Sequence, residues 1–217
     1  MLPLLLGALL YLKPVTFLVQ EVNALFAEIS ERFNSFQSNN NLSCLSGCGK
    51  CCSYPDITCT TLEALPFAYD IYLEGSLEDF KLRLETNVGS TCLLFKSLDE
   101  FSNNGFCTRY QDRPSICRMF GAYAYRNKQS VYQLALCSTL KKQHPNPALK
   151  ENLDSSLTMS YWNQRLQDLE PNLTREQLPI NKALLKAIYY LEDYFYFNPY
   201  NNLSNGTILK NNNSSNS

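Results

Sequence analysis

Histidine is almost absent from this sequence, which has one such residue in 217. Imidazole is the usual proton-transfer group and a frequent partner of cysteine in mixed metal sites, so this scarcity excludes a histidine-rich centre. A non-haem iron site built on two histidines and an open hydrolytic zinc site are excluded for the same reason. His144 stands in the charged stretch 141–145 and is interpreted as a surface residue. Any metal that this chain binds must be held mainly by sulfur.

An excess of positive charge is also missing, because 19 lysines and arginines face 20 aspartates and glutamates. Without a net positive field or a long basic block, nucleic acid is not an expected partner. No Ser–His–Asp set and no paired carboxylates of a hydrolase are discernible. The stretch 47–50 is not a phosphate-binding loop, because Cys44 and Cys51 occupy positions where that motif needs Gly and Ser or Thr.

Long apolar runs are equally scarce. The run from Leu2 to Leu12 ends at Lys13 and Pro14, at about half of the roughly 20 residues that a membrane-spanning helix needs. We interpret residues 1–14 as an apolar segment packed on the domain, with a signal peptide or a shallow membrane anchor as the alternative. The cysteine count of nine is odd, and an odd count leaves an unpaired thiol in a secreted protein. A cytoplasmic protein without membrane association is therefore the prediction.

Apolar residues three and four positions apart are typical of helices that bury one face, and several segments show this spacing. Thr60 with Glu63, and Ser76 with Asp79, are capping signals at which two helices are predicted to begin. A further short helix is predicted from Ser115 or Ile116, after Pro114. The longer predicted helices cover residues 15–36, 61–73, 77–87, 157–169 and 180–195.

The remaining segments are shorter. Alternating residues from Ala122, interrupted at Asn127-Lys128, predict a small β-hairpin that ends near Cys137. Residues 141–147 are predicted to form a polar loop. Residues 198–217 are rich in Asn and Ser, and we expect them to be disordered.

These elements predict a single domain over residues 15–197, with a cysteine cluster at 44–137 and a helical C-terminal part. The expected fold class is mainly α, with an irregular cysteine-rich metal core and a small β-hairpin, that is, a mostly helical α+β fold.

The first cysteine group places four sulfurs within nine residues, at Cys44, Cys48, Cys51 and Cys52. The two-residue spacer between Cys48 and Cys51 lets both sulfurs face one ion. Adjacent side chains diverge, so Cys52 more easily serves a second ion or a cluster. A thioredoxin-like redox motif is disfavoured, because this segment follows a polar loop and is crowded by two further cysteines.

The second group, Cys92, Cys107, Cys117 and Cys137, is accompanied by Arg109, Arg113 and Arg118. Four thiolates around one divalent ion leave a net charge near −2, which neighbouring arginines would offset by hydrogen bonds to sulfur. Ordinary surface positions for these arginines stay open. Cys59 has no partner at ligand spacing and is interpreted as a buried or free thiol.

The order and spacing of these residues, with Cys107-Thr108-Arg109-Tyr110, Arg113-Pro114 and Cys117-Arg118 between them, resemble the CxxCxxCC or YkgJ-type cysteine-cluster family. The nominal motif has two residues after the first cysteine, whereas three follow Cys44. The resemblance implies a zinc- or iron-chelating domain with eight characteristic cysteines. On this sequence they are Cys44, Cys48, Cys51, Cys52, Cys92, Cys107, Cys117 and Cys137.

Three functions stay open. The first is a cytoplasmic zinc- or iron-chelating protein whose metal ion is structural or stored, since an ion closed in by sulfur performs no chemistry itself. The second is an iron–sulfur-dependent redox or protein-modifying enzyme, because a related cysteine segment occurs in flagellin lysine N-methylases. The third is a secreted disulfide-bonded protein. The metal ion is the one partner that all-sulfur ligation predicts.

Overall fold

The computed structural model describes residues 13–45, 47–52, 54, 57–99 and 104–199. Apart from its last two residues, the predicted apolar segment 1–14 lies outside this part of the chain. Residues 200–217, most of the predicted tail, also lie outside it. Within the described ranges the fold is mostly helical, with seven α-helices and three two-stranded antiparallel sheets. The predicted mostly helical α+β class is confirmed.

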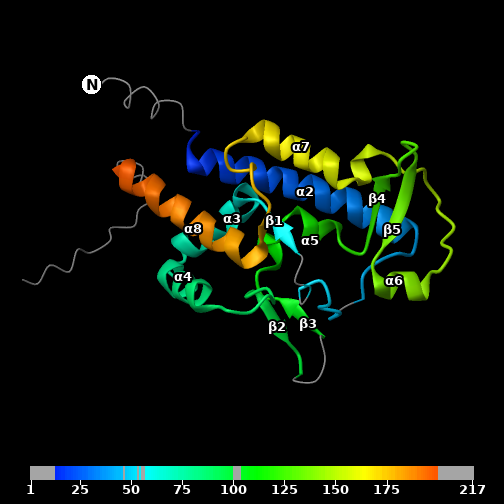
Figure 1. Cartoon of the computed structure of the whole chain (residues 1–217), viewed down its shortest axis with the longest axis horizontal. Coiled ribbons are helices and arrows are strands. Elements are labelled where there is room, and N and C mark those ends of the chain that lie inside the picture. Colours follow the sequence, from blue (N-terminus) through cyan, green and yellow to red (C-terminus); the bar gives the residue numbers. More distant parts are fainter. Residues whose placement is uncertain (1–12, 46, 53, 55–56, 100–103, 200–217) are drawn as a thin grey trace, which may run out of the picture.

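Helix α2, Val15–Asn39, forms the long axis of the molecule and packs against α3, α5 and α7 (Figure 1). Its apolar residues recur every three to four positions, so one face is buried along the whole helix. Phe26, Phe33 and Phe36 on that face are at most 2% exposed. The helix also carries a buried glutamine, Gln37, at the end where the chain enters the cysteine segment.

Helix α3, Thr61–Leu73, begins at the predicted capping box. The Thr60 hydroxyl accepts a hydrogen bond from the Glu63 backbone N–H, and the Glu63 carboxylate accepts from the Thr60 N–H. Helix α4, Leu77–Thr86, forms as predicted, but Ser76 does not cap it. The Ser76 hydroxyl donates instead to the carbonyl of Ile71, because the chain turns tightly from α3 into α4.

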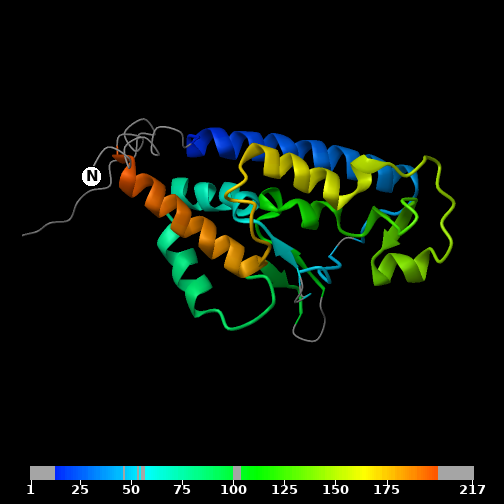
Figure 2. The ribbon, with the colours of Figure 1, turned by 45° about the horizontal axis from the view of Figure 1, so that its top comes forward.

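Helix α8, Ile180–Phe197, lies across α3 and α4, as both ribbon views show (Figures 1 and 2). The Lys81 ammonium donates to the Glu192 carboxylate at 2.7 Å and links α4 to α8. The rings of Tyr72 and Phe195 stack with centroids 4.6 Å apart and join the ends of α3 and α8. These contacts lie toward the end of the molecule where the described chain begins and ends (Figure 1).

The predicted hairpin consists of β4, Ala122–Arg126, and β5, Tyr132–Leu136. Its turn is held by Asn127, whose side-chain oxygen accepts from the backbone N–H groups of Gln129 and Val131. The predicted loop 141–147 is partly wrong, because α6, Ser138–Gln143, covers its beginning. The Cys137 sulfur accepts a hydrogen bond from the Leu140 N–H at the start of this helix. Leu140 is buried, so it attaches the otherwise polar segment to the hydrophobic core.

Two further strand pairs were not predicted. Strand β1, Thr58–Cys59, pairs with β6, Leu178–Pro179, and β2, Phe95–Ser97, pairs with β3, Gly105–Cys107. Strands of two or three residues give too few alternating positions to be recognised in a sequence. The α5 helix, Ser115–Met119, follows Pro114 as predicted, after the 3₁₀ turn η1, Tyr110–Asp112.

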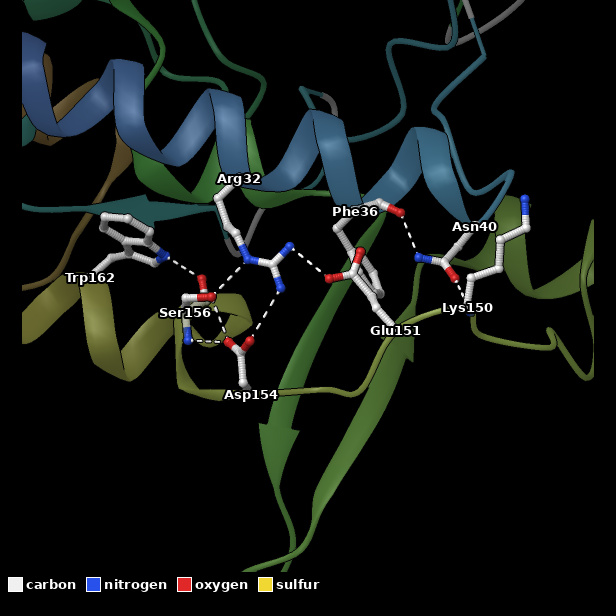
Figure 3. A network of polar contacts seen from close by, with 8 residues as sticks. All are labelled: Arg32, Phe36, Asn40, Lys150, Glu151, Asp154, Ser156 and Trp162. Carbon is white, nitrogen blue, oxygen red and sulfur yellow. Dashed lines mark hydrogen bonds and ion pairs between the residues drawn. The ribbon is translucent and has the colours of Figure 1, made fainter.

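Helix α7, Met159–Leu169, follows the 3₁₀ turn η2, Ser155–Leu157, and both are attached to α2 by a polar network (Figure 3). The Arg32 guanidinium on α2 donates to the Ser156 hydroxyl at 2.8 Å and pairs with Glu151 and Asp154 at 3.1 and 3.3 Å. The Trp162 indole N–H donates to the Ser156 carbonyl at 2.8 Å. The C-terminal third is thereby fixed to the first helix. No helix in the described part of the chain has the length and apolarity needed to cross a bilayer.

Candidate metal centre

A cavity of about 630 Å³ lies between the end of α2, the first cysteine group, strand β3 and helix α5. In both ribbon views the chain after α2 passes beside β3 (Figures 1 and 2). Seven of the eight predicted ligands line the cavity, although they come from separate segments. They are Cys44, Cys48, Cys51, Cys52, Cys92, Cys107 and Cys117.

The first cysteine group is shaped by a series of tight turns. Gly47 and Gly49 have φ of +70° and +58°, a left-handed conformation that costs glycine little because it has no Cβ. The Cys48 N–H donates to Leu45 O, and the Cys52 N–H donates to Gly49 O. The chain therefore reverses within a few residues and brings the sulfurs of this group to one wall of the cavity.

Backbone hydrogen bonds join the second group to the first. The Cys92 N–H donates to the Cys52 carbonyl at 3.0 Å, and the Gly105 N–H donates to Gly47 O at 2.9 Å. Cys107 lies directly opposite Phe95 in the β2–β3 pair. The main chain, rather than contact between sulfurs, thus holds the distant cysteine segments around the cavity.

Two cysteines do not line this cavity. Cys137 stands at the start of α6, near enough to Cys44 to act electrostatically on that thiol. Cys59 is 1% exposed in strand β1, where burial raises the pKa of its thiol well above the ordinary value. Its exclusion from the predicted ligand set accords with a position in the hydrophobic core.

The thiols differ in their readiness to ionise. Cys51 and Cys52 have their sulfurs 3.9 Å apart, and the hydrogen bond from Cys52 lowers the pKa of Cys51 to about 6. The same interaction, with burial, raises the pKa of Cys52. Burial raises the pKa of Cys92 to about 11 and also raises that of Cys117. Among the thiols whose pKa is shifted, Cys51 is therefore the one that ionises most readily, and the thiolate is the form that binds metals.

Cys51 also acts electrostatically on most of the other thiols that line the cavity. Its charge raises the pKa of five other thiols, added in each case to the effect of burial or of a hydrogen bond. These five are Cys44, Cys52, Cys92, Cys107 and Cys117.

The donor set suits a thiophilic metal, because thiolates are the preferred ligands of structural zinc and of iron–sulfur clusters. Within the described ranges, however, no three or more His, Cys, Asp or Glu side chains lie close enough together to hold one ion. The seven thiols surround a shared space and do not converge on a single point. The eight-cysteine ligand set is therefore still a prediction.

The sequence did not predict the polar wall of the cavity. Asn34, Gln37 and Ser38 of α2 line it, and Gln37 donates to the Phe120 carbonyl at 3.4 Å. Gln37 lies one residue beyond the helix predicted over residues 15–36, so its place on the buried face of α2 was not recognised. Gly105 also lines the cavity and was not predicted as part of the site, because no local pattern indicates that its backbone lies against Phe95.

The fold and the cavity together define a mostly helical protein with an all-sulfur candidate metal centre. Residues 43–142 match the model of the CxxCxxCC family, described as "putative zinc- or iron-chelating domain", which is the family that the cysteine spacing resembles. The match includes all eight predicted ligands, and Cys59 as well. No curated protein and no solved structure matched the chain.

Proposed function

We propose that this protein binds zinc or iron through cysteine thiolates alone, with the metal ion in a structural or storage role. The observation that supports this best is the gathering of seven predicted ligands around one cavity. The proposed ligands are these seven and Cys137, which acts electrostatically on the Cys44 thiol. Eight thiolates are enough for two tetrahedral ions, for a thiolate-bridged pair, or for one cluster with further ligands to spare.

The state of the thiols supports this proposal. All nine cysteines are free in the structure. A reducing cytoplasm would keep them so, and metal binding would then compete only with protonation. Among the described residues that line the cavity there is no histidine or carboxylate to activate a bound water, so hydrolysis is not part of the proposal.

Cys51→Ser is the most informative variant, because the Cys51 thiolate acts on five other thiols of the cavity. We expect it to lose bound metal and to destabilise the cysteine segment, since metal affinity contributes folding free energy in such sites. The matched control is Cys59→Ala, which removes a thiol from the core. It is expected to keep full metal content and to lose roughly 1–2 kcal/mol of stability through the vacated volume.

The experiment begins with anaerobic purification of the full chain. Zinc, iron and acid-labile sulfide are then measured, and an absorption spectrum is taken. Colourless protein with near-stoichiometric zinc supports a zinc site, whereas iron with sulfide and visible absorption supports the cluster form. Wild-type protein without either metal and with intact disulfides would contradict the proposal. Equal metal content in Cys51→Ser and Cys59→Ala would contradict the ligand assignment.

A further inference from the structure

Three arginines stand among the second group of cysteines, and two of them are bound mainly to other parts of the fold. Arg109 pairs with Glu74 at 2.7 Å and with Asp112 at 2.8 Å, and it does not line the cavity. Arg118 lines the cavity, but its three nitrogens donate to the Arg113 carbonyl, the Ser30 hydroxyl and the Gln111 carbonyl. Both side chains hold the fold together.

Arg113 is different. It lines the cavity with the cysteines, and only its Nε is engaged, donating to the Tyr110 carbonyl at 3.1 Å. Its guanidinium carbon lies 3.4 Å from the centre of the Tyr110 ring, so the side chain is stacked in place. Among the described residues, neither terminal nitrogen has a hydrogen-bond partner or a carboxylate within ion-pair distance. A cation is thus held at the sulfur-lined cavity with hydrogen-bonding groups to spare.

The positive charge of Arg113 acts on three thiols that come from separate segments, Cys51, Cys107 and Cys117. Thiolate ligands give any metal centre here a surplus of negative charge, near −2 for four thiolates around one divalent ion. Arginine keeps its charge at all relevant pH values, and its planar fork can donate to two sulfurs. Because the cavity is partly screened from water, one cation at its wall has more effect than it would in bulk solvent.

We propose that Arg113 is a positioning residue of the metal centre, one that offsets the surplus charge of the thiolates and thereby strengthens metal retention. This inference rests on the proposed metal-binding function. It separates Arg113 from Arg109, which does not line the cavity, and from Arg118, whose side-chain nitrogens all donate to other parts of the fold.

The test measures the affinity of the reduced full chain for Zn²⁺, and anaerobically for Fe²⁺, by competition with a chromophoric chelator. Arg113→Gln removes the charge at similar volume, and we expect it to weaken binding by about tenfold or more. Arg113→Lys keeps the charge, and it should stay within about threefold of wild type. The matched control is Arg126→Gln, which removes an arginine that also stacks on a tyrosine, Tyr132, away from this cavity.

Two further readouts separate charge compensation from a merely structural role. The loss of metal affinity in Arg113→Gln should become smaller in 1 M NaCl, because the screening length there falls to about 3 Å. In urea, the metal-free variant should unfold at the same midpoint as metal-free wild type.

Equal affinity of Arg113→Gln and wild type would overturn the inference, and so would an Arg113→Lys variant as weak as Arg113→Gln. A lowered urea midpoint of the metal-free Arg113→Gln protein would assign the residue to the fold instead. If wild type binds neither metal, the proposed function fails. If wild type binds and all arginine variants match it, only the role of Arg113 fails.

Discussion

Glu63 is the buried carboxylate that joins helix α3 to the cysteine-bearing helix α5. It is 2% exposed, and its Oε2 accepts from the Thr60 N–H at 2.8 Å and from the Thr60 hydroxyl at 2.9 Å. Its Oε1 accepts from the Ser115 N–H at 3.1 Å, in the first turn of α5. One side chain therefore closes the N-terminus of α3 and fixes the start of the helix that carries Cys117.

The perturbation is Glu63→Gln, which keeps the shape of the side chain but turns one oxygen into an NH₂ group. The single amide oxygen can accept from either Thr60 or Ser115. The buried N–H of the other residue then faces the new NH₂ group, which is itself a donor. A buried donor left without a partner costs about 1–3 kcal/mol. The remaining hydrogen bond is also weakened, because its acceptor is no longer a charged carboxylate. We therefore expect the free energy of unfolding to fall by roughly 2–4 kcal/mol.

The assay is equilibrium urea unfolding of the reduced, metal-free protein, with the slope compared between variants. The matched control is Glu176→Gln, since Glu176 pairs with Lys186 while both side chains are more than half exposed. Such an exposed pair contributes at most about 1 kcal/mol. A loss below about 1 kcal/mol for Glu63→Gln, or a loss equal to that of the control, would refute the role given to the buried carboxylate.

Two further variants test the surroundings of the candidate centre. Gly105→Ala would place a Cβ 2.4 Å from the Lys96 carbonyl oxygen, so it should cost roughly 1–3 kcal/mol in urea unfolding and weaken zinc binding, whereas Gly89→Ala, in an exposed loop, should do neither. Burial, opposed by Arg109 and assisted by Asp70, raises the pKa of Asp112 to about 6, so the folded state holds this proton more tightly than the unfolded state. As the pH rises from 4 to 6, wild-type metal-free protein should therefore lose roughly 1–2 kcal/mol of stability relative to Asp112→Asn, and a constant difference would contradict this.

The helical part of the fold could be predicted because its signals are local. The predicted helix at residues 61–73 has the bounds of α3, since the capping box and the apolar run coincide there. The end of α2 was predicted three residues too early, because the polar, Asn-rich residues after Phe36 are typical of a loop. In the structure the helix continues to Asn39, and the Asn40 side chain closes it by donating to the Phe36 carbonyl at 2.7 Å. Leu140, a single buried residue in a charged stretch, is the whole apolar signal of α6.

The candidate centre was predictable in composition but not in arrangement. Cysteine spacing predicted which sulfurs belong together within a segment, because neighbours in sequence must be neighbours in space. The link between segments depends on pairs such as Cys92 N–H with Cys52 O, and no local pattern marks a backbone hydrogen bond between distant residues. The same limit applies to the arginines, which are alike in sequence until the structure shows that Glu74 and Asp112 engage Arg109.

Loss of metal and loss of fold need not coincide in this protein. Small zinc domains unfold without metal because they have little else to bury. Here α2, α3 and α8 share a hydrophobic core whose side chains, such as Phe33, Leu65 and Ile188, are fully buried. That core gains its stability from burial and does not need a bound metal ion. The cysteine segments, by contrast, are held by short turns and by single hydrogen bonds to their neighbours. A metal ion would add stability mainly where the helices add least, around the cavity that the cysteines surround.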